Sequence, residues 1–163
     1  MQAFKRILVP IDFSEVSHAA LSTALQLASD NDAKLYVLHV VKELDRELKK
    51  RLVSAPNDDV IESSIREGEK RILDAVQLEQ ERAREAGRTL KSVPLKMLVT
   101  GGDWLEVTLG LIDEYELDLI VTGTHGGSGI KSIFLGSMSE QLVKKASCST
   151  FVVKPQGFPY LRD

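Results

Sequence analysis

The sequence contains little cysteine, few aromatic residues and no long apolar run. One cysteine among 163 residues, Cys148, excludes an internal disulfide, which is typical of a protein from a reducing compartment. No apolar run approaches the roughly 20 residues that a membrane-spanning helix needs, and the first residues show no signal-peptide apolar segment. We therefore expect a cytoplasmic protein that does not insert into membranes.

The sequence also lacks an excess of positive charge. It has 21 lysine and arginine residues against 24 aspartate and glutamate residues, a net charge of -3 at pH 7. A general nucleic-acid-binding domain carries a basic face, so nucleic acid is not an expected partner. Hydrophobic residues make up 43% of a chain whose length suits one domain. We expect that domain over residues 1–155 and a short tail over residues 156–163.

Five short apolar runs alternate with stretches of helical spacing. The runs are continuous, which is typical of parallel strands that are buried on both faces. Leu21 and Leu25 mark a helical face between the first two runs, and Leu105, Leu109 and Ile112 mark another between the third and fourth. This alternation predicts an α/β sheet. The runs cover residues 7–9, 35–41, 95–99, 119–121 and 151–153.

Residues 42–91 differ from the rest of the chain because they carry 12 basic and 12 acidic residues in 50 positions. From residue 61 onward, apolar residues recur at helical spacing, and we expect a long helix over residues 59–86 that Gly87 ends. The preceding residues 42–58 have a loop-like composition and are either a surface insertion or a flap over a neighbouring crevice. The apolar stripe of the helix consists of Ile61, Ile65, Ile72, Val76 and Ala83.

Gly123 and Gly126 follow the fourth apolar run, and Gly136 and Ser137 begin the next helical stretch. Glycine lets the backbone adopt left-handed angles and approach a ligand closely. The amides and the dipole at the start of a helix attract anions. The four residues therefore predict a phosphate cradle. The alternative is a strand-to-loop corner followed by an ordinary helix entry.

The spacing Gly-x2-Gly-x9-Gly-Ser is similar to that of the nucleotide-binding members of the universal stress protein family. The resemblance extends to residues 5–14, 35–40, 119–125 and 151–155. It implies a universal-stress-type nucleotide-binding domain, with a single open five-stranded parallel sheet of order 3-2-1-4-5 and helices on both faces. In that order the winding reverses between the first and fourth strands, where open α/β sheets bind ligands. We therefore expect the ends of these two strands to face each other across one crevice.

The resemblance implies that the crevice binds ATP, with Mg2+ arriving on the nucleotide. Asp12 is expected to accept hydrogen bonds from the adenine or ribose or to help hold Mg2+, and the backbone of Ile11 and Val40 is expected beside the adenine. The alternative for Asp12 is a carboxylate favoured near a helix start by the dipole. No catalytic residue and no resident metal site is assigned. The expected nucleotide-binding residues are Pro10, Ile11, Asp12, Val40, Thr122, Gly123, His125, Gly126, Gly136, Ser137, Met138 and Ser139.

Besides Asp12, three residues of this set have expected roles of their own. The resemblance places His125 beside the phosphates, and the alternative is an ordinary polar loop residue. The Ser137 hydroxyl either caps the helix that it begins or donates to a phosphate. Ser139 is expected as a second phosphate donor.

These observations predict a cytoplasmic ATP-binding stress-response sensor or regulator. The resemblance implies a homodimer built by the last strand, over residues 150–154 with Thr150 and Lys154 at its ends, because an apolar edge strand is prone to pairing. One alternative is a slow ATP hydrolase or phosphotransferase. The sequence leans against an enzyme because it lacks a Walker lysine, an arginine finger and an identifiable base. The other alternative is an interaction protein of the same fold that binds no nucleotide.

Overall fold

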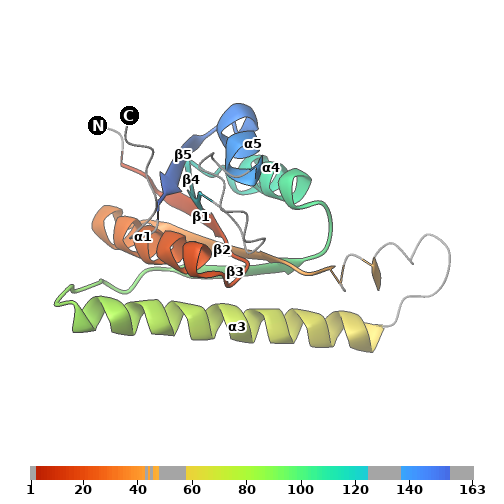
Figure 1. The fold of residues 1–163 in the computed structure, drawn as a ribbon, viewed down its shortest axis with the longest axis horizontal. Coiled ribbons are helices and arrows are strands. Elements are labelled where there is room, and N and C mark those ends of the chain that lie inside the picture. The colour runs from red at the N-terminus through yellow and green to blue at the C-terminus, as the bar shows by residue number, and fades with distance from the viewer. Residues whose placement is uncertain (1–2, 43, 45, 48–57, 125–136, 155–163) are drawn as a thin grey trace, which may run out of the picture.

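Five parallel strands form the middle layer of the computed structural model, which describes residues 3–42, 44, 46–47, 58–124 and 137–154 (Figure 1). Their order in the sheet is β3-β2-β1-β4-β5, and every neighbouring pair is parallel. The expected α/β sheet and its strand order are therefore confirmed. The strands are β1 (Arg6–Pro10), β2 (Lys34–Val40), β3 (Leu95–Thr100), β4 (Leu119–Gly123) and β5 (Ser149–Val153).

Helices cover both faces of the sheet (Figure 1). The helices α1 (Glu15–Asn31) and α3 (Asp58–Glu85) lie on one face, and α4 (Trp104–Tyr115) and α5 (Ser137–Lys145) lie on the other. Successive residues of a strand point to opposite faces. In β1, Ile7 and Val9 therefore join the core beneath α1 and α3, whereas Leu8 joins the core beneath α4 and α5. All three are fully buried, as a continuous apolar run predicts.

Two of the helices begin at side chains that cap them. The Ser14 hydroxyl accepts a hydrogen bond from the amide of Ser17 at 3.3 Å and caps α1. Asp103 Oδ1 accepts from the amides of Leu105 and Glu106, each at 3.0 Å, and caps α4. Such caps satisfy amides that have no partner inside the helix. Local sequence therefore determines where both helices start, beside the carboxyl edge of the sheet.

The helix α3 confirms the long helix expected over residues 59–86. Gly87 follows its end with a φ of 73°, as a helix-terminating glycine does. The expected apolar stripe is buried from Ile72 to Ala83, whereas Ile61 and Ile65 are partly exposed. The first turns of α3 extend past the carboxyl ends of the strands, so the sheet buries them less (Figure 1). Neither α3 nor any other described helix is apolar enough along its length to cross a membrane.

A buried carboxylate and one close approach hold α3 in place. Glu79 is 3% exposed and accepts hydrogen bonds from His18 Nδ1 of α1 at 2.9 Å and from Arg82 Nη1 at 2.7 Å. A buried carboxylate is costly without such partners. On the sheet side, a Cβ added at Gly68 would lie 2.7 Å from Cγ1 of Val99, so glycine allows α3 to approach β3 closely. The position of α3 is therefore fixed against both α1 and the sheet.

The helix α4 packs somewhat differently from the expected face. Ile112 is buried, but Leu105 and Leu109 contact the core and stay partly exposed. Thr108 is fully buried in their place, and its hydroxyl donates to the carbonyl oxygen of Trp104 at 2.8 Å. This bond satisfies the hydroxyl within the helix, so a polar residue is tolerated on the buried face.

Candidate functional site

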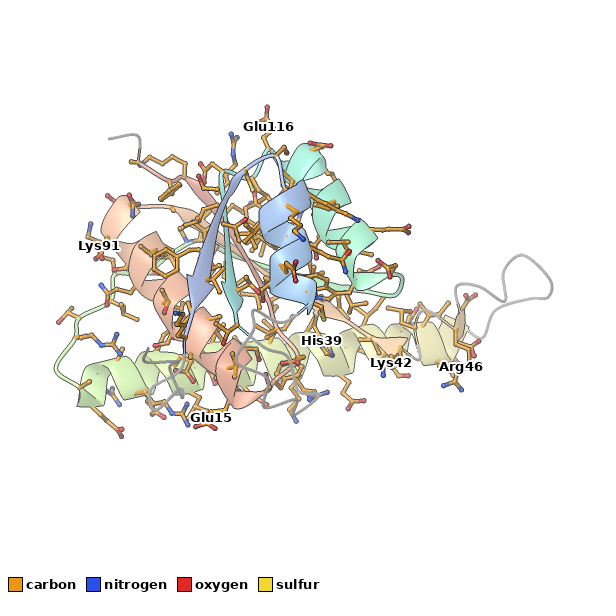
Figure 2. The ribbon with its side chains drawn as sticks, turned by 45° about the horizontal axis from the view of Figure 1, so that its top comes forward. Glu15, His39, Lys42, Arg46, Lys91 and Glu116 are labelled. Carbon is orange, nitrogen blue, oxygen red and sulfur yellow. The ribbon has the colours of Figure 1, made fainter. Side chains whose placement is uncertain are left out.

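The carboxyl ends of β1 and β4 lie side by side where the sheet changes its winding direction. In Figure 2, Glu15 at the start of α1 and His39 in β2 lie toward this end of the strands, and Glu116, which precedes β4, lies at the opposite end. A crevice of about 80 Å³ opens beyond the strand ends. Eight of the twelve residues predicted as ligand contacts line it. The full lining consists of Pro10, Ile11, Asp12, Ser17, Val40, Trp104, Thr122, Gly123, Met138 and Ser139.

The other four predicted residues belong to the glycine motif. His125, Gly126 and Gly136 lie outside the described residues. Ser137 is the first residue of α5, but its side chain is outside the described part of the structure. The phosphate cradle and the cap at Ser137 therefore stay predictions.

Gly123 allows the first turn of α1 to contact the end of β4. A Cβ at this position would overlap the Val16 side chain and would lie 3.1 Å from the Val16 carbonyl oxygen. Any larger residue would push α1 away from β4. The glycine is therefore required by the packing of the protein itself, in addition to any role toward a ligand.

Asp12 follows β1 in a tight turn that leads into α1. Its Oδ1 accepts a hydrogen bond from the amide of Ser14 at 3.0 Å, and its side chain is exposed at the crevice. Asp12 is thus two residues before the N-cap rather than inside the helix. The carboxylate shapes the turn and also forms part of the crevice wall.

A cluster of rings supports this turn from the α3 side. Phe13 has a φ of 62°, and its ring meets the ring of His39 edge to face, with centroids 4.6 Å apart. The Nδ1–H of His39 donates to the carbonyl oxygen of Ile11 at 3.0 Å. Burial lowers the pKa of His39, and the bond to Ile11 opposes that shift in part. Arg71 lies over the Phe13 ring, with its guanidinium carbon 3.9 Å from the ring centroid. These supporting residues were not predicted from the sequence.

Ile11 contributes its backbone to the protein rather than leaving it open to a ligand. Its amide donates to the carbonyl oxygen of Leu38 at 2.8 Å, and its carbonyl accepts from His39. Ile11 still lines the crevice. Its predicted place beside an adenine is therefore better suited to van der Waals contact than to a backbone hydrogen bond.

Ser139 connects α5 to the end of β4. It is buried, and its hydroxyl donates a hydrogen bond to the carbonyl oxygen of Gly123. The single proton of that hydroxyl is therefore already used. The predicted donation from Ser139 to a phosphate would require this bond to break, and the structure instead gives Ser139 a role in joining α5 to β4.

Ser17 and Trp104 line the crevice but were not predicted as site residues. Ser17 is on the first turn of α1, and its hydroxyl donates to the carbonyl oxygen of Ser14 at 2.9 Å. Trp104 is the first residue of α4. A crossover helix begins at the carboxyl edge of a parallel sheet, so the strand order already brings both helix starts to this edge. The strand order implied by the sequence could therefore have indicated that both residues lie near the site.

A larger cavity of about 410 Å³ lies on the α3 side of β2 and shares Val40 with the crevice. Its other walls include His39, Lys42, Glu67 and Arg71. We place the candidate site in the smaller crevice because it lies at the switch point, where open α/β sheets bind ligands. It also gathers the predicted residues from β1, β2, β4 and α5, whereas the larger cavity shares only Val40 with them.

Within the described ranges, no group of three histidine, cysteine, aspartate or glutamate side chains is arranged to hold a metal ion. Among the described lining residues, Asp12 supplies the one carboxylate that could bind a metal ion at the crevice.

The fold and the crevice define an open α/β protein with a crevice at the switch point of its sheet. Residues 3–154 match the sequence profile described as the Universal stress protein family, and the chain belongs to that family. The universal stress protein MJ0577 of Methanocaldococcus jannaschii is 30% identical over 156 residues, which cover 93% of this chain and 95% of that protein. The universal stress protein YxiE of Bacillus subtilis is 30% identical over 153 residues, covering 93% and 99%.

Solved structures share the fold at lower sequence identity. The universal stress protein UspA from Lactobacillus plantarum has a TM-score of 0.68 and 23% identity, covering 94% of this chain and 99% of that one. A universal stress protein in complex with cAMP has a TM-score of 0.60 and 22% identity, covering 94% and 98%. A family member from Arabidopsis thaliana with AMP bound has a TM-score of 0.52 and 17% identity, covering 94% and 93%.

Proposed function

We propose that this protein binds ATP together with Mg2+ in the crevice and acts in the cytoplasm as a stress-response sensor or regulator. The observation that carries the proposal is the gathering of eight predicted contact residues from four elements around one crevice. Family membership and the two relatives that hold cAMP and AMP support an adenine nucleotide as the ligand. Hydrolysis is not part of the proposal.

The nucleoside is proposed to occupy the described part of the crevice. The carboxylate of Asp12 accepts hydrogen bonds from the ribose or the base, while Val40 and Ile11 contact the base through their apolar surfaces. The phosphates then extend toward Gly126 and Gly136 of the glycine motif. Backbone amides at such glycines and at the following helix start are suited to bind the phosphate charge.

Asp12 fits the proposed Mg2+. Proteins usually hold this ion through one or two carboxylates together with substrate phosphates, rather than through a complete set of protein ligands. Asp12 supplies one carboxylate at the crevice. The ion would neutralise phosphate charge and so favour binding of a triphosphate beside an acidic residue.

The proposal includes a homodimer joined through β5. This strand is at the edge of the sheet, next to β4 alone, and Phe151 within it is 46% exposed. An edge strand presents unpaired amides and carbonyls, and an exposed aromatic ring adds apolar surface. Pairing with a second copy would cover both.

Isothermal titration calorimetry with ATP and Mg2+ tests the nucleotide proposal. We expect saturable heat for the wild-type protein and none for Gly126→Val, because a branched side chain would occupy the proposed phosphate space. Gly110→Val is the matched control, since a Cβ at Gly110 meets nothing within 4 Å. Its affinity should equal that of the wild type.

Two results would contradict the proposal. The first is the absence of both heat and a thermal-shift response in the folded wild-type protein. The second is an unchanged affinity in a folded Gly126→Val variant, which would show that the glycine motif is not the phosphate site. Circular dichroism establishes folding, and phosphate release from the same samples detects any hydrolysis.

A further inference from the structure

We infer that Trp104 is a specificity-determining residue that stacks on the base of the nucleotide. The inference deepens the proposed function and rests on it. Trp104 lines the crevice together with Asp12 and Val40, although it comes from α4, an element without any predicted contact residue. The ligand class is a nucleoside with an aromatic base.

The described lining residues are better suited to a nucleoside than to a bare phosphate. Among the described lining residues, the carboxylate of Asp12 is the only ionisable group, and none of them is a lysine or arginine. A carboxylate repels a phosphate unless a cation lies between them. Val40, Met138 and Trp104 add apolar surface to the lining of the crevice. This combination suits a flat ring with polar edges.

The volume of the crevice also suits one part of a nucleotide better than a complete nucleotide. Its volume is about 80 Å³. Sites that enclose complete drug-sized ligands are typically ~300–1,000 Å³. The described walls are therefore matched to one group of the nucleotide, and the phosphates lie beyond them.

Hydrogen bonds anchor the backbone around Trp104, and its side chain packs against the core. Asp103 caps the helix and occupies the amides of Leu105 and Glu106, so the start of α4 offers these amides to its own cap rather than to an anion. The carbonyl oxygen of Trp104 accepts the Thr108 hydroxyl at 2.8 Å. The ring packs against the core beneath α4 and α5 while remaining partly exposed. Such a ring stacks on a base without a large loss of side-chain entropy.

Three ligands separate contact with the base from contact with the phosphates: adenosine, ATP with Mg2+, and inorganic tripolyphosphate with Mg2+. Base–aromatic stacking is worth roughly 1–3 kcal/mol by alanine substitution. For Trp104→Ala we therefore expect adenosine and ATP to lose affinity by the same factor, about 5- to 150-fold. Tripolyphosphate affinity should stay within about twofold. Trp104→Phe should retain most of the nucleoside affinity, and Trp104→Leu should lose most of it although it is apolar.

Tyr115→Leu is the matched control because it removes an aromatic ring at the other end of the same helix. Tyr115 packs against Tyr36, with ring centroids 5.1 Å apart, and does not line the crevice. Its loss should lower the unfolding temperature without changing adenosine affinity. This control separates stacking from a general loosening of α4.

The wild-type protein supplies a test that needs no variant. Trp104 is the only tryptophan of the chain, so its fluorescence reports on the crevice directly. Adenosine should change the emission and protect it from acrylamide quenching, and tripolyphosphate should do neither.

The outcomes distinguish this inference from the proposed function. If ATP binds but the fluorescence does not respond to adenosine, and the folded Trp104→Leu variant binds ATP as the wild type does, the stacking role is wrong and the nucleotide proposal survives. If the wild type binds none of the three ligands, both are wrong. If tripolyphosphate loses affinity as strongly as adenosine, Trp104 acts through the whole site and the stacking role is wrong.

Discussion

The guanidinium carbon of Arg71 lies 3.9 Å from the centroid of the Phe13 ring, which places the long helix α3 directly against the turn that carries Asp12. Phe13 has a φ of 62°, and a left-handed conformation costs a non-glycine residue on the order of 1–3 kcal/mol. The Arg71 and His39 contacts on its ring offset this cost. The turn at the candidate site therefore depends on residues from a helix that does not line it.

Replacing Arg71 by methionine should weaken ATP binding although Arg71 does not line the crevice. Methionine retains apolar bulk but removes the cation–π contact, which is worth roughly 0.5–2 kcal/mol. We expect about a 2- to 30-fold loss in calorimetric affinity, since the Asp12 turn is no longer held. Arg84→Met on the same helix is the control, because the Arg84 side chain is exposed and its ion pair with Glu81 is long, at 3.6 Å. Equal affinities in both variants would show that α3 does not support the site.

Replacing Ser139 by alanine separates a structural role from a phosphate contact. The variant leaves the Gly123 carbonyl without its Ser139 partner, so the free energy of unfolding should fall by roughly 1–3 kcal/mol. Adenosine and ATP should lose affinity by the same factor, because the loss acts through the end of β4. The control is Ser63→Ala, which removes an exposed hydroxyl that donates to its own helix at 3.1 Å.

A loss of affinity for ATP alone would contradict this assignment of Ser139. It would show that the hydroxyl leaves Gly123 and donates to a phosphate when the nucleotide binds. Urea unfolding gives the stability and calorimetry gives the two affinities.

Replacing Phe151 by glutamate should convert the proposed dimer to a monomer. The charge would be placed on the edge strand β5, where pairing with a second copy would bury it at high cost. Val143→Glu is the matched control, because Val143 is 54% exposed on α5 rather than on the edge strand. Sedimentation velocity at tens of micromolar should give a dimer for the wild type and the control. A monomeric wild-type protein would contradict the dimer.

Stability should fall as the pH decreases below the ordinary pKa of histidine, and His39 should be one cause. Burial lowers the pKa of His39 in the folded protein from its usual value of 6.5, so the unfolded chain binds this proton more readily. The contribution of neutral His39 is therefore complete above that value and is lost as the pH falls through the folded pKa. Urea unfolding at about pH 7.5 and about pH 5.5 measures the loss.

The matched variant for that experiment is His39→Gln, which retains a donor toward the carbonyl oxygen of Ile11 but does not titrate. Its stability should decrease less than that of the wild type between the two pH values. Parallel losses in both proteins would assign the pH dependence to other groups.

The elements of the fold could be predicted because each has a signal within a short stretch of sequence. Continuous apolar runs predicted the five strands, and Gly87 marked the end of α3. The exposure of Ile61 was not predictable from the same stripe that buries Ile72, because it depends on where the sheet ends beneath the helix.

By itself, the sequence determined that Asp12 follows one strand and Gly123 ends another, and with the implied strand order it brought them to one crevice. The tertiary structure alone decided that Ser139 donates to Gly123, that Arg71 lies over Phe13 and that Trp104 forms a wall of the site. The physical reason is that hydrophobic periodicity and turn chemistry act between neighbours in the chain. These contacts join residues from different elements, and they exist only once the packing of helices on the sheet has set their distances.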